Sequence, residues 1–149
     1  DKRQLVAQQV RKKVDSLTAK NEDAKIIIMG DLNDDPINKS VKKVLNATNK
    51  EKLKDGQLFN ASAKSFSNGV GTLYYRGAWN LFDQIIVSKG LLSTSRGVTM
   101  TKNSFSIFGP DWMRQKTGNY AGAPLRSYVS NVYQYGYSDH FPTYILLEK

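Results

Sequence analysis

A run of four apolar residues, Ile26 to Met29, restricts the fold of this chain more than any other feature. The run is rich in β-branched residues and stops at Gly30, which is typical of a strand buried on both faces and too short for a buried helix. Before it, apolar residues recur with the helical period, predicting an amphipathic helix over residues 2–19. The apolar positions of that helix are Val6, Val10, Val14 and Leu17. A helix followed by a buried strand predicts an α/β layer.

The middle of the chain carries a second helix signal and a hairpin signal. Asp35-Pro36 predicts a helix start, because Asp caps free amides and Pro fits the first helical position. The buried side of that helix would comprise Val41, Val44 and Leu45. The stretches 72–76 and 81–87, separated by a break at Gly77, predict a hairpin.

Beyond residue 105 the periodic pattern is lost. Residues 105–136 predict a long structured loop region with one short strand near Tyr128 and Val129. The apolar stretch from Phe141 to Leu147 predicts a final strand, with Pro142 near its beginning.

Composition excludes several classes of site. The 149 residues contain no cysteine, which excludes disulfide scaffolds, Cys-ligated zinc and thiol catalysis. His140 is the single histidine, which excludes a centre with several His ligands. The formal net charge of +9 favours a polyanionic partner such as nucleic acid, but solvated helix faces explain it at least as well. No apolar run approaches the roughly 20 residues of a membrane span.

Three polar clusters adjoin predicted strands. The first is Gly30-Asp31-Leu32-Asn33, where residues two apart in extended backbone would project to the same side. Asp31 and Asn33 together would hold a water and bind a phosphate oxygen. The alternative is an ordinary strand-end turn, because Asp and Asn favour turns.

The other two clusters contain an isolated carboxylate and the histidine. Asp83 lies among apolar residues, so its carboxylate needs a histidine N–H, a backbone amide or a cation, unless it faces water from an edge strand. Ser138-Asp139-His140-Phe141-Pro142 precedes the last predicted strand. An aspartate that orients the imidazole would make His140 reactive. The alternative is a purely structural histidine.

Taken together and in this order, the three motifs resemble the endonuclease/exonuclease/phosphatase superfamily. They are Asp31-Leu32-Asn33 after an apolar strand, an Asp-Gln-Ile-Ile-Val-Ser strand from Asp83, and Ser138 to Pro142. The segment from Gly118 to Tyr128 is similar to a bacterial branch of that family. The resemblance implies an α/β fold, a deoxyribonuclease-like four-layer sandwich with a mixed, largely antiparallel sheet and flanking helices. Residues 1–149 would form the C-terminal half of one such domain.

The resemblance also implies Mg²⁺-dependent hydrolysis of phosphate esters, with Mn²⁺ as an alternative ion. Asp31 would bind the attacking water and the metal, and Asn33 would contact the phosphate. Asp83 would orient His140, which would stabilise the phosphoryl oxygen or exchange a proton with it. Asp139 would assist the metal. A hard divalent cation, carboxylates and an imidazole together supply what phosphodiester hydrolysis requires.

The family's N-terminal Asn and metal-binding Glu would precede Asp1, where neither an initiator Met nor a signal peptide pattern is found. We therefore expect a missing N-terminal half, so that the isolated chain is weakly active or inactive. We also expect an apolar sheet face exposed for that half or for a second copy. Any targeting signal would lie upstream, which leaves the compartment open.

The partner is expected to be a phosphate-ester substrate, with nucleic acid, a phospholipid head group and an inositol phosphate all open. Candidate basic contacts are Arg76, Lys102, Arg114, Lys116 and Arg126. Nearby aromatic residues that would stack on bases, or fill the core, are Trp112, Tyr120 and Tyr128. The alternative function is a noncatalytic polyanion-binding module on the same fold.

Overall fold

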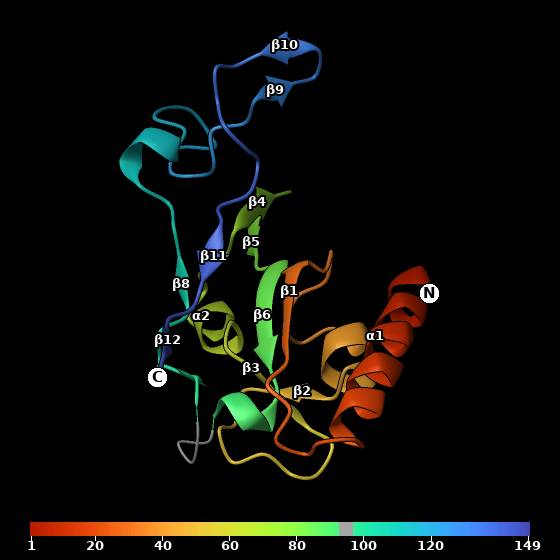
Figure 1. The fold of residues 1–149 in the computed structure, drawn as a ribbon. Helices are drawn as coiled ribbons and strands as arrows, with labels where there is room; N and C mark the ends of the chain where they lie inside the picture. Colours follow the sequence, from red (N-terminus) through yellow and green to blue (C-terminus); the bar gives the residue numbers. More distant parts are fainter. Residues whose placement is uncertain (93–96) are drawn as a thin grey trace.

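A central sheet with the strand order β1-β6-β3-β2 organises the protein, which we describe from a computed structural model at residues 1–92 and 97–149. These strands are β1 (Ile27–Asp31), β6 (Asp83–Val87), β3 (Leu58–Asn60) and β2 (Ala47–Thr48). The helix α1 (Lys2–Thr18) and the π-helical turn η1 (Ser40–Val44) cover one side of the sheet (Figure 1). The predicted α/β class is therefore confirmed.

The remaining elements are short. They are α2 (Ala63–Ser67), β4 (Leu73–Tyr75), β5 (Ala78–Asn80), η2 (Lys89–Leu91), β7 (Thr99–Met100), β8 (Ser106–Ile107), η3 (Asp111–Met113), β9 (Tyr128–Val129), β10 (Val132–Tyr133), β11 (Thr143–Tyr144) and β12 (Leu147–Glu148). Among the described strands, β2 and β3 pair in parallel and the other pairs are antiparallel, which gives the mixed, largely antiparallel arrangement expected. The β9–β10 hairpin stands away from the central sheet at the top of Figure 1.

Helix α1 lies where the sequence predicts it, but its buried side is rotated. Asp1 caps the helix by accepting a hydrogen bond from the Arg3 amide at 3.0 Å. Ala7 and Val14 are buried and the predicted Val10 packs against the same cluster, whereas Val6 is 64% exposed. Two residues seven apart share a helix face, so the contact with the sheet follows positions 7 and 14 and leaves out the predicted Val6 and Leu17.

The prediction that Ile26 to Met29 form a strand buried on both faces is wrong. Met29 is 73% exposed and Ile27 is also exposed, because the apolar cluster that covers Ile85 and Val87 on the same face of the sheet does not extend over β1. Ile28 does pack against the core. The strand buried on both faces is β6, in which Ile85, Ile86 and Val87 are all buried. Ile27 and Met29 are thus apolar side chains exposed on one face of β1. The expected N-terminal half stays a prediction.

The predicted second helix is much shorter than its signals suggest. Asp35 and Pro36 lie in turns, and the only helical turn described in this stretch is η1. The Asp35 carboxylate accepts a hydrogen bond from the Leu81 amide at 2.7 Å, so it holds a distant loop and does not cap a helix. Val41 and Leu45 are buried as predicted.

The predicted hairpin has a different second strand. β4 pairs with β5, with Leu73 opposite Asn80 and Tyr75 opposite Ala78. The turn consists of Arg76 and Gly77, both with positive φ, the geometry that matches the twist of antiparallel strands. Residues 83–87 instead form β6 in the central sheet.

The last predicted strand is divided in two: β11 pairs with β8, and β12 pairs with β7. Short strands with separate partners take the place of one continuous strand. The predicted short strand at Tyr128 and Val129 is β9.

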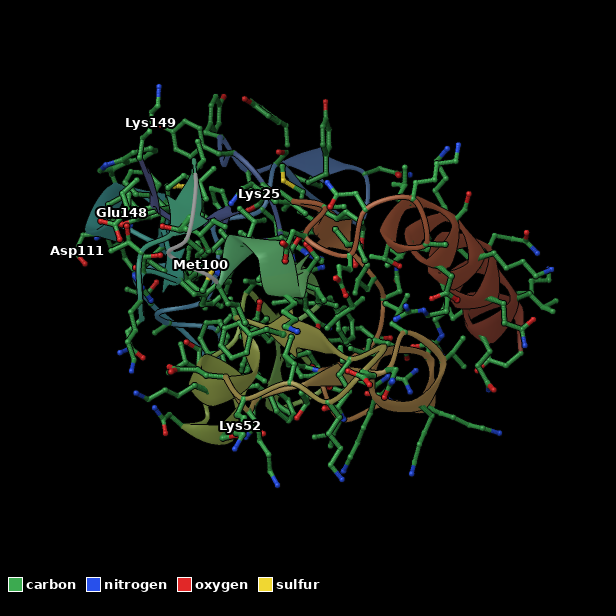
Figure 2. The ribbon with its side chains drawn as sticks, turned by 60° about the horizontal axis from the view of Figure 1, so that its bottom comes forward. Lys25, Lys52, Met100, Asp111, Glu148 and Lys149 are labelled. Atoms are coloured by element: carbon green, nitrogen blue, oxygen red, sulfur yellow. The ribbon has the colours of Figure 1, made fainter. Side chains whose placement is uncertain are left out.

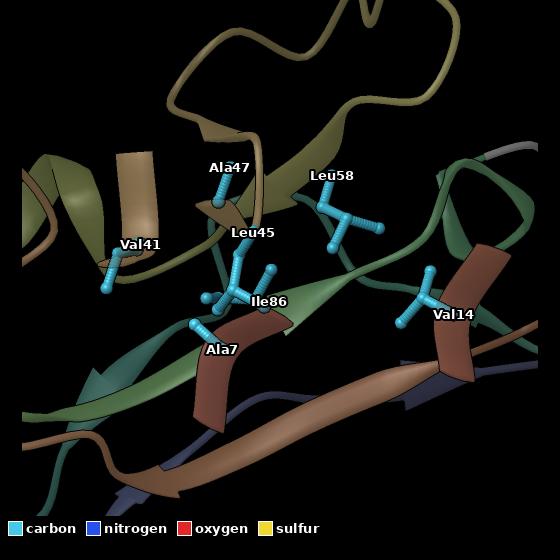
Figure 3. Close-up of a cluster of buried hydrophobic side chains, with 7 residues drawn as sticks. All are labelled: Ala7, Val14, Val41, Leu45, Ala47, Leu58 and Ile86. Atoms are coloured by element: carbon cyan, nitrogen blue, oxygen red, sulfur yellow. The ribbon is translucent and has the colours of Figure 1, made fainter. Parts of the chain in front are cut away.

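Two apolar clusters lie on opposite faces of β6. The first surrounds Ile86 and includes Ala7 and Val14 of α1 (Figure 3). The second contains Ile85, Val87 and Leu91, packed against residues that include Met100 and Phe105. No helix in the described part of the chain is long and apolar enough to cross a membrane. The labelled lysines Lys25, Lys52 and Lys149 lie well apart in Figure 2, so basic side chains are not confined to one side of the molecule in this view.

Candidate active site

The Asp31 end of β1 and the Asp83 end of β6 meet at one edge of the central sheet. In the antiparallel register of β1 with β6, Asp31 lies directly opposite Asp83. This edge faces the β4–β5 hairpin, and the chain returning from β10 passes it (Figure 1). Like charges directly opposite each other destabilise a sheet unless other groups compensate, so this pairing calls for positive or hydrogen-bonding partners.

His140 supplies that partner. Its Nδ1 lies 2.7 Å from Asp83 Oδ2, and both side chains are largely buried, with 19% and 21% exposure. The Thr72 hydroxyl donates to the same oxygen at 2.5 Å, and Thr72 itself is fully buried. Two donors thus hold the Asp83 carboxylate against the ring. This is the partner that an isolated carboxylate among apolar residues requires.

Three carboxylates affect the pKa of the His140 imidazole. The hydrogen bond to the Asp83 carboxylate raises the pKa of His140 above its ordinary value of 6.5, although burial of the ring opposes this. The charges of Asp83, Asp139 and Asp31 raise the pKa further. Residues 31, 83, 139 and 140 are therefore close enough in space to interact electrically, although they are far apart in the sequence.

The first motif, Gly30-Asp31-Leu32-Asn33, ends in a turn, which agrees with the alternative interpretation of a strand-end turn. Asp31 Oδ1 accepts a hydrogen bond from the Asn33 amide at 2.8 Å, and Asn33 has a positive φ of 50°. Because β1 ends at Asp31, the extended geometry expected to align Asp31 and Asn33 does not hold. Both residues are nonetheless exposed, and Asp31 lies opposite Asp83, the partner of His140.

Buried polar residues hold this turn through hydrogen bonds to Asp34. The sequence did not predict their role. The fully buried Gln84 donates from Nε2 to the Asp34 carbonyl at 2.5 Å and accepts from Asn60 Nδ2 at 2.7 Å. The Ser40 hydroxyl donates to the buried Asp34 carboxylate at 2.5 Å. The sequence offers one signal for this role: Gln84 lies between Asp83 and three buried apolar residues. A buried amide must have hydrogen-bond partners, so Gln84 is expected to bind other polar groups.

A second anchor comes from helix α1. Arg3 Nη1 donates to the Asn33 carbonyl at 2.5 Å and lies 3.2 Å from Asp34 Oδ1. Thr72 is the other residue that the sequence did not reveal, because only the fold brings it to Asp83. The turn and the histidine are thus positioned by separate, well-connected elements.

The described residues contain no group of three His, Cys, Asp or Glu placed to hold a metal ion. Asp83 is already bonded to Thr72 and His140. Asp31 and Asp139 are exposed and offer carboxylate oxygens. Mg²⁺ usually binds through one or two carboxylates while it keeps several waters, so this donor set fits Mg²⁺ but not a closed protein cage.

Three of the expected basic contacts have other partners or lie outside the cavity that contains Asp139. Arg114 donates to the carbonyls of Gly109 and Gly122 at 2.7 and 2.8 Å, so it is structural. Lys102 pairs with Glu51 at 3.1 Å and lines a different cavity. Lys116 is exposed and lies outside both cavities described. Arg76 and Arg126, in contrast, line a cavity that also includes Asp139.

The histidine geometry predicts a measurable titration. In metal-free protein, an NMR titration of the single histidine should give a pKa above 6.5, since Asp83 hydrogen-bonds to the ring. Asp83→Asn should bring that pKa down more than Asp139→Asn does, because Asp139 acts through charge alone. A raised folded pKa means that this contribution to stability is complete below about pH 6.5 and is lost as the pH rises through the folded pKa. A wild-type pKa at or below 6.5 would contradict the Asp83–His140 bond.

Comparison with known proteins gives a match at the level of the family. The model of the Endonuclease/Exonuclease/phosphatase family matches residues 1–149. No curated protein and no solved structure matches the chain.

Proposed function

The chain belongs to the endonuclease/exonuclease/phosphatase family, and on that basis we propose that it hydrolyses phosphodiesters with an aspartate-oriented histidine, His140. The family is generally hydrolytic, of the phosphoesterase or nuclease type. The observation that carries the proposal is the 2.7 Å contact between His140 Nδ1 and Asp83 Oδ2 at the edge that also carries Asp31. Such a pair orients a ring for chemistry at its other nitrogen.

In this proposal Asp83 and His140 stabilise the phosphoryl group as charge develops on it. Asp83 fixes the tautomer in which Nδ1 carries a proton, so Nε2 is the nitrogen that meets the substrate. The raised pKa of His140 favours the imidazolium, in which Nε2 also carries a proton and donates to a phosphoryl oxygen. Thr72 keeps the Asp83 carboxylate in place while the ring gives or takes that proton.

The remaining roles fall to the turn after β1. The Asp31 carboxylate would orient the attacking water, and the Asn33 amide would donate to a phosphate oxygen. Enzymes of this family are typically dependent on divalent metals. Asp31 and Asp139 would hold Mg²⁺ or Mn²⁺, which supplies positive charge that neutralises the phosphoryl oxygens. Gln84 and Arg3 would keep the turn in position.

A hydrolysis assay on the protein in its full encoded length tests the proposal. The substrates are bis(p-nitrophenyl) phosphate, a diester, and p-nitrophenyl phosphate, a monoester, each with Mg²⁺, Mn²⁺ or EDTA. We expect diester cleavage with either metal ion and its loss with EDTA. Asp31→Asn should lower kcat by about 100-fold or more, the usual range for a group that moves or orients a proton.

Asp55→Asn is the matched control, because Asp55 is an exposed aspartate in the loop before β3 and has no part in the site. It should leave cleavage unchanged. Binding of polyanions without cleavage under any metal condition would overturn the proposal and favour the noncatalytic module. Equal loss of activity in Asp31→Asn and Asp55→Asn would show that the assay reports folding and not the site.

A further inference from the structure

A cavity of about 300 Å³ adjoins the candidate active site and has no role in the chemistry described so far. Asp139, the neighbour of His140 in the sequence, lines the cavity, so the cavity and the candidate active site share this residue. Its walls come from two parts of the chain: the tip of the β4–β5 hairpin, and residues between 115 and 134. Its volume lies at the lower end of the range for small-molecule sites.

The walls of the cavity carry tyrosines held by aromatic contacts. Tyr74 lies edge-on to Tyr120, with ring centroids 5.9 Å apart, and edge-on to Trp79 at 5.4 Å. These contacts join the hairpin to the 115–134 wall. Aromatic side chains at such a wall bind the faces of rings in a ligand.

The far wall is fixed by a close approach of the backbone. A Cβ at Gly136 would lie 2.1 Å from the Leu125 carbonyl oxygen, so only glycine fits there. The Tyr137 amide donates to the same carbonyl at 3.0 Å. Arg126 follows directly in the sequence, and its position on the cavity is therefore determined by ordered backbone.

Two arginines, Arg76 and Arg126, line this cavity, and their side chains make different contacts from those of Arg3, Arg11 and Arg114. Arg3, Arg11 and Arg114 all donate to backbone carbonyls. Within residues 1–92 and 97–149, neither Arg76 nor Arg126 forms an ion pair or donates a side-chain hydrogen bond. Arg76 instead lies over the Tyr75 ring at 5.1 Å. Guanidinium groups that line a cavity without a carboxylate partner are suited to bind phosphate.

We propose that this cavity binds a second phosphate group of the substrate, held by Arg76 and Arg126, together with a ring that contacts the tyrosines. The proposal rests on the proposed function, because it places this phosphate beside the ester that the site around His140 would hydrolyse. The substrate class is thus a phosphodiester with a further phosphate close by. A neighbouring nucleotide and a multiply phosphorylated small molecule both meet this description.

Two substrates that differ by one phosphate test the proposal directly. They are the 5′-(p-nitrophenyl phosphate) of thymidine and the same compound with a 3′-phosphate. We expect wild-type protein of full encoded length to show a higher kcat/KM for the bisphosphate. Arg76→Gln and Arg126→Gln should each reduce that preference by about 10-fold, the usual effect of losing one charged hydrogen bond. Arg126→Lys should retain part of it, since the charge stays but the fork is lost.

Lys52→Gln is the control for net charge, because it removes one positive charge from an exposed residue that does not line the cavity and is labelled in Figure 2. It should leave the preference unchanged. The same ratio in wild type and both arginine variants, or an equal fall in Lys52→Gln, would overturn the proposal.

Competition distinguishes the two sources of the phosphate. Inhibition by a short oligothymidylate but not by inositol trisphosphate identifies a nucleotide substrate, and the reverse identifies a small polyphosphate. Inhibition by neither would contradict the subsite.

Calorimetry with thymidine 3′,5′-bisphosphate separates failure of this proposal from failure of the proposed function. If no substrate is cleaved, binding that persists in His140→Ala but is lost in Arg126→Gln still supports the cavity. Binding that is unchanged in both arginine variants overturns it.

Discussion

His140→Ala is expected to lower kcat for phosphodiester hydrolysis by about 10²- to 10⁴-fold, the range for removal of a positioned acid or base. The ring is the group that Asp83 and Thr72 hold at the edge of the sheet, and three carboxylates act on its charge. The measurement is steady-state kinetics with bis(p-nitrophenyl) phosphate at saturating Mg²⁺. The change should fall on kcat more than on KM, because the histidine acts on charge that develops in the transition state.

His140→Gln separates a chemical role from a structural one. Glutamine can still donate a hydrogen bond toward Asp83, but it cannot exchange a proton near neutral pH. It should therefore be nearly as inactive as the alanine variant while its unfolding midpoint stays closer to that of the wild type. Rescue of activity by glutamine, or activity of His140→Ala within about tenfold of wild type, would contradict the proposed role.

Ile86→Ala is expected to lower the free energy of unfolding by about 2–5 kcal/mol, the usual cost of truncating a fully buried aliphatic side chain. Ile86 has no exposed surface and lies at the centre of the cluster that joins α1 to the sheet (Figure 3). The alanine leaves a cavity that helix and sheet can only partly close. Equilibrium denaturation with urea measures the change.

Met29→Ala is the matched control for that experiment. Met29 lies on the neighbouring strand β1 but is 73% exposed, so its truncation should change the free energy of unfolding by about 0.5 kcal/mol or less. Similar losses for both variants would show that the exposed edge of β1 is covered in the protein in solution. A small loss for Ile86→Ala would contradict the arrangement of α1 over the sheet.

The parts of the fold that follow from local pattern were predictable from the sequence. Helix α1 has a clear period, and β6 has a continuous apolar run. The exposure of Met29 was not predictable, because an apolar run does not show whether another element covers each of its two faces. The hairpin partner of β4 was also missed, since the short strand at Ala78–Asn80 precedes a much stronger apolar strand.

Within the candidate site, the sequence predicts charged residues that the fold brings close together, but it does not predict the residues that position them. Asp83 and His140 are conspicuous because each is unusual in its surroundings. Thr72 and Ser40 are ordinary residues whose importance depends on contacts across 11 and 6 positions of the chain. Arg3 reaches its turn from 30 positions away. Such contacts depend on how whole helices and strands pack, so no local sequence pattern predicts them.

The pairing of β1 with β6 makes strand alignment a condition for assembling the site. Asp31 faces Asp83 only in the observed register, and a slip by one residue would set Asp83 against Gly30 or Leu32. Such a slip also turns every side chain of one strand to the opposite face. Inserting a single residue within β1 would therefore separate the carboxylates without removing either of them.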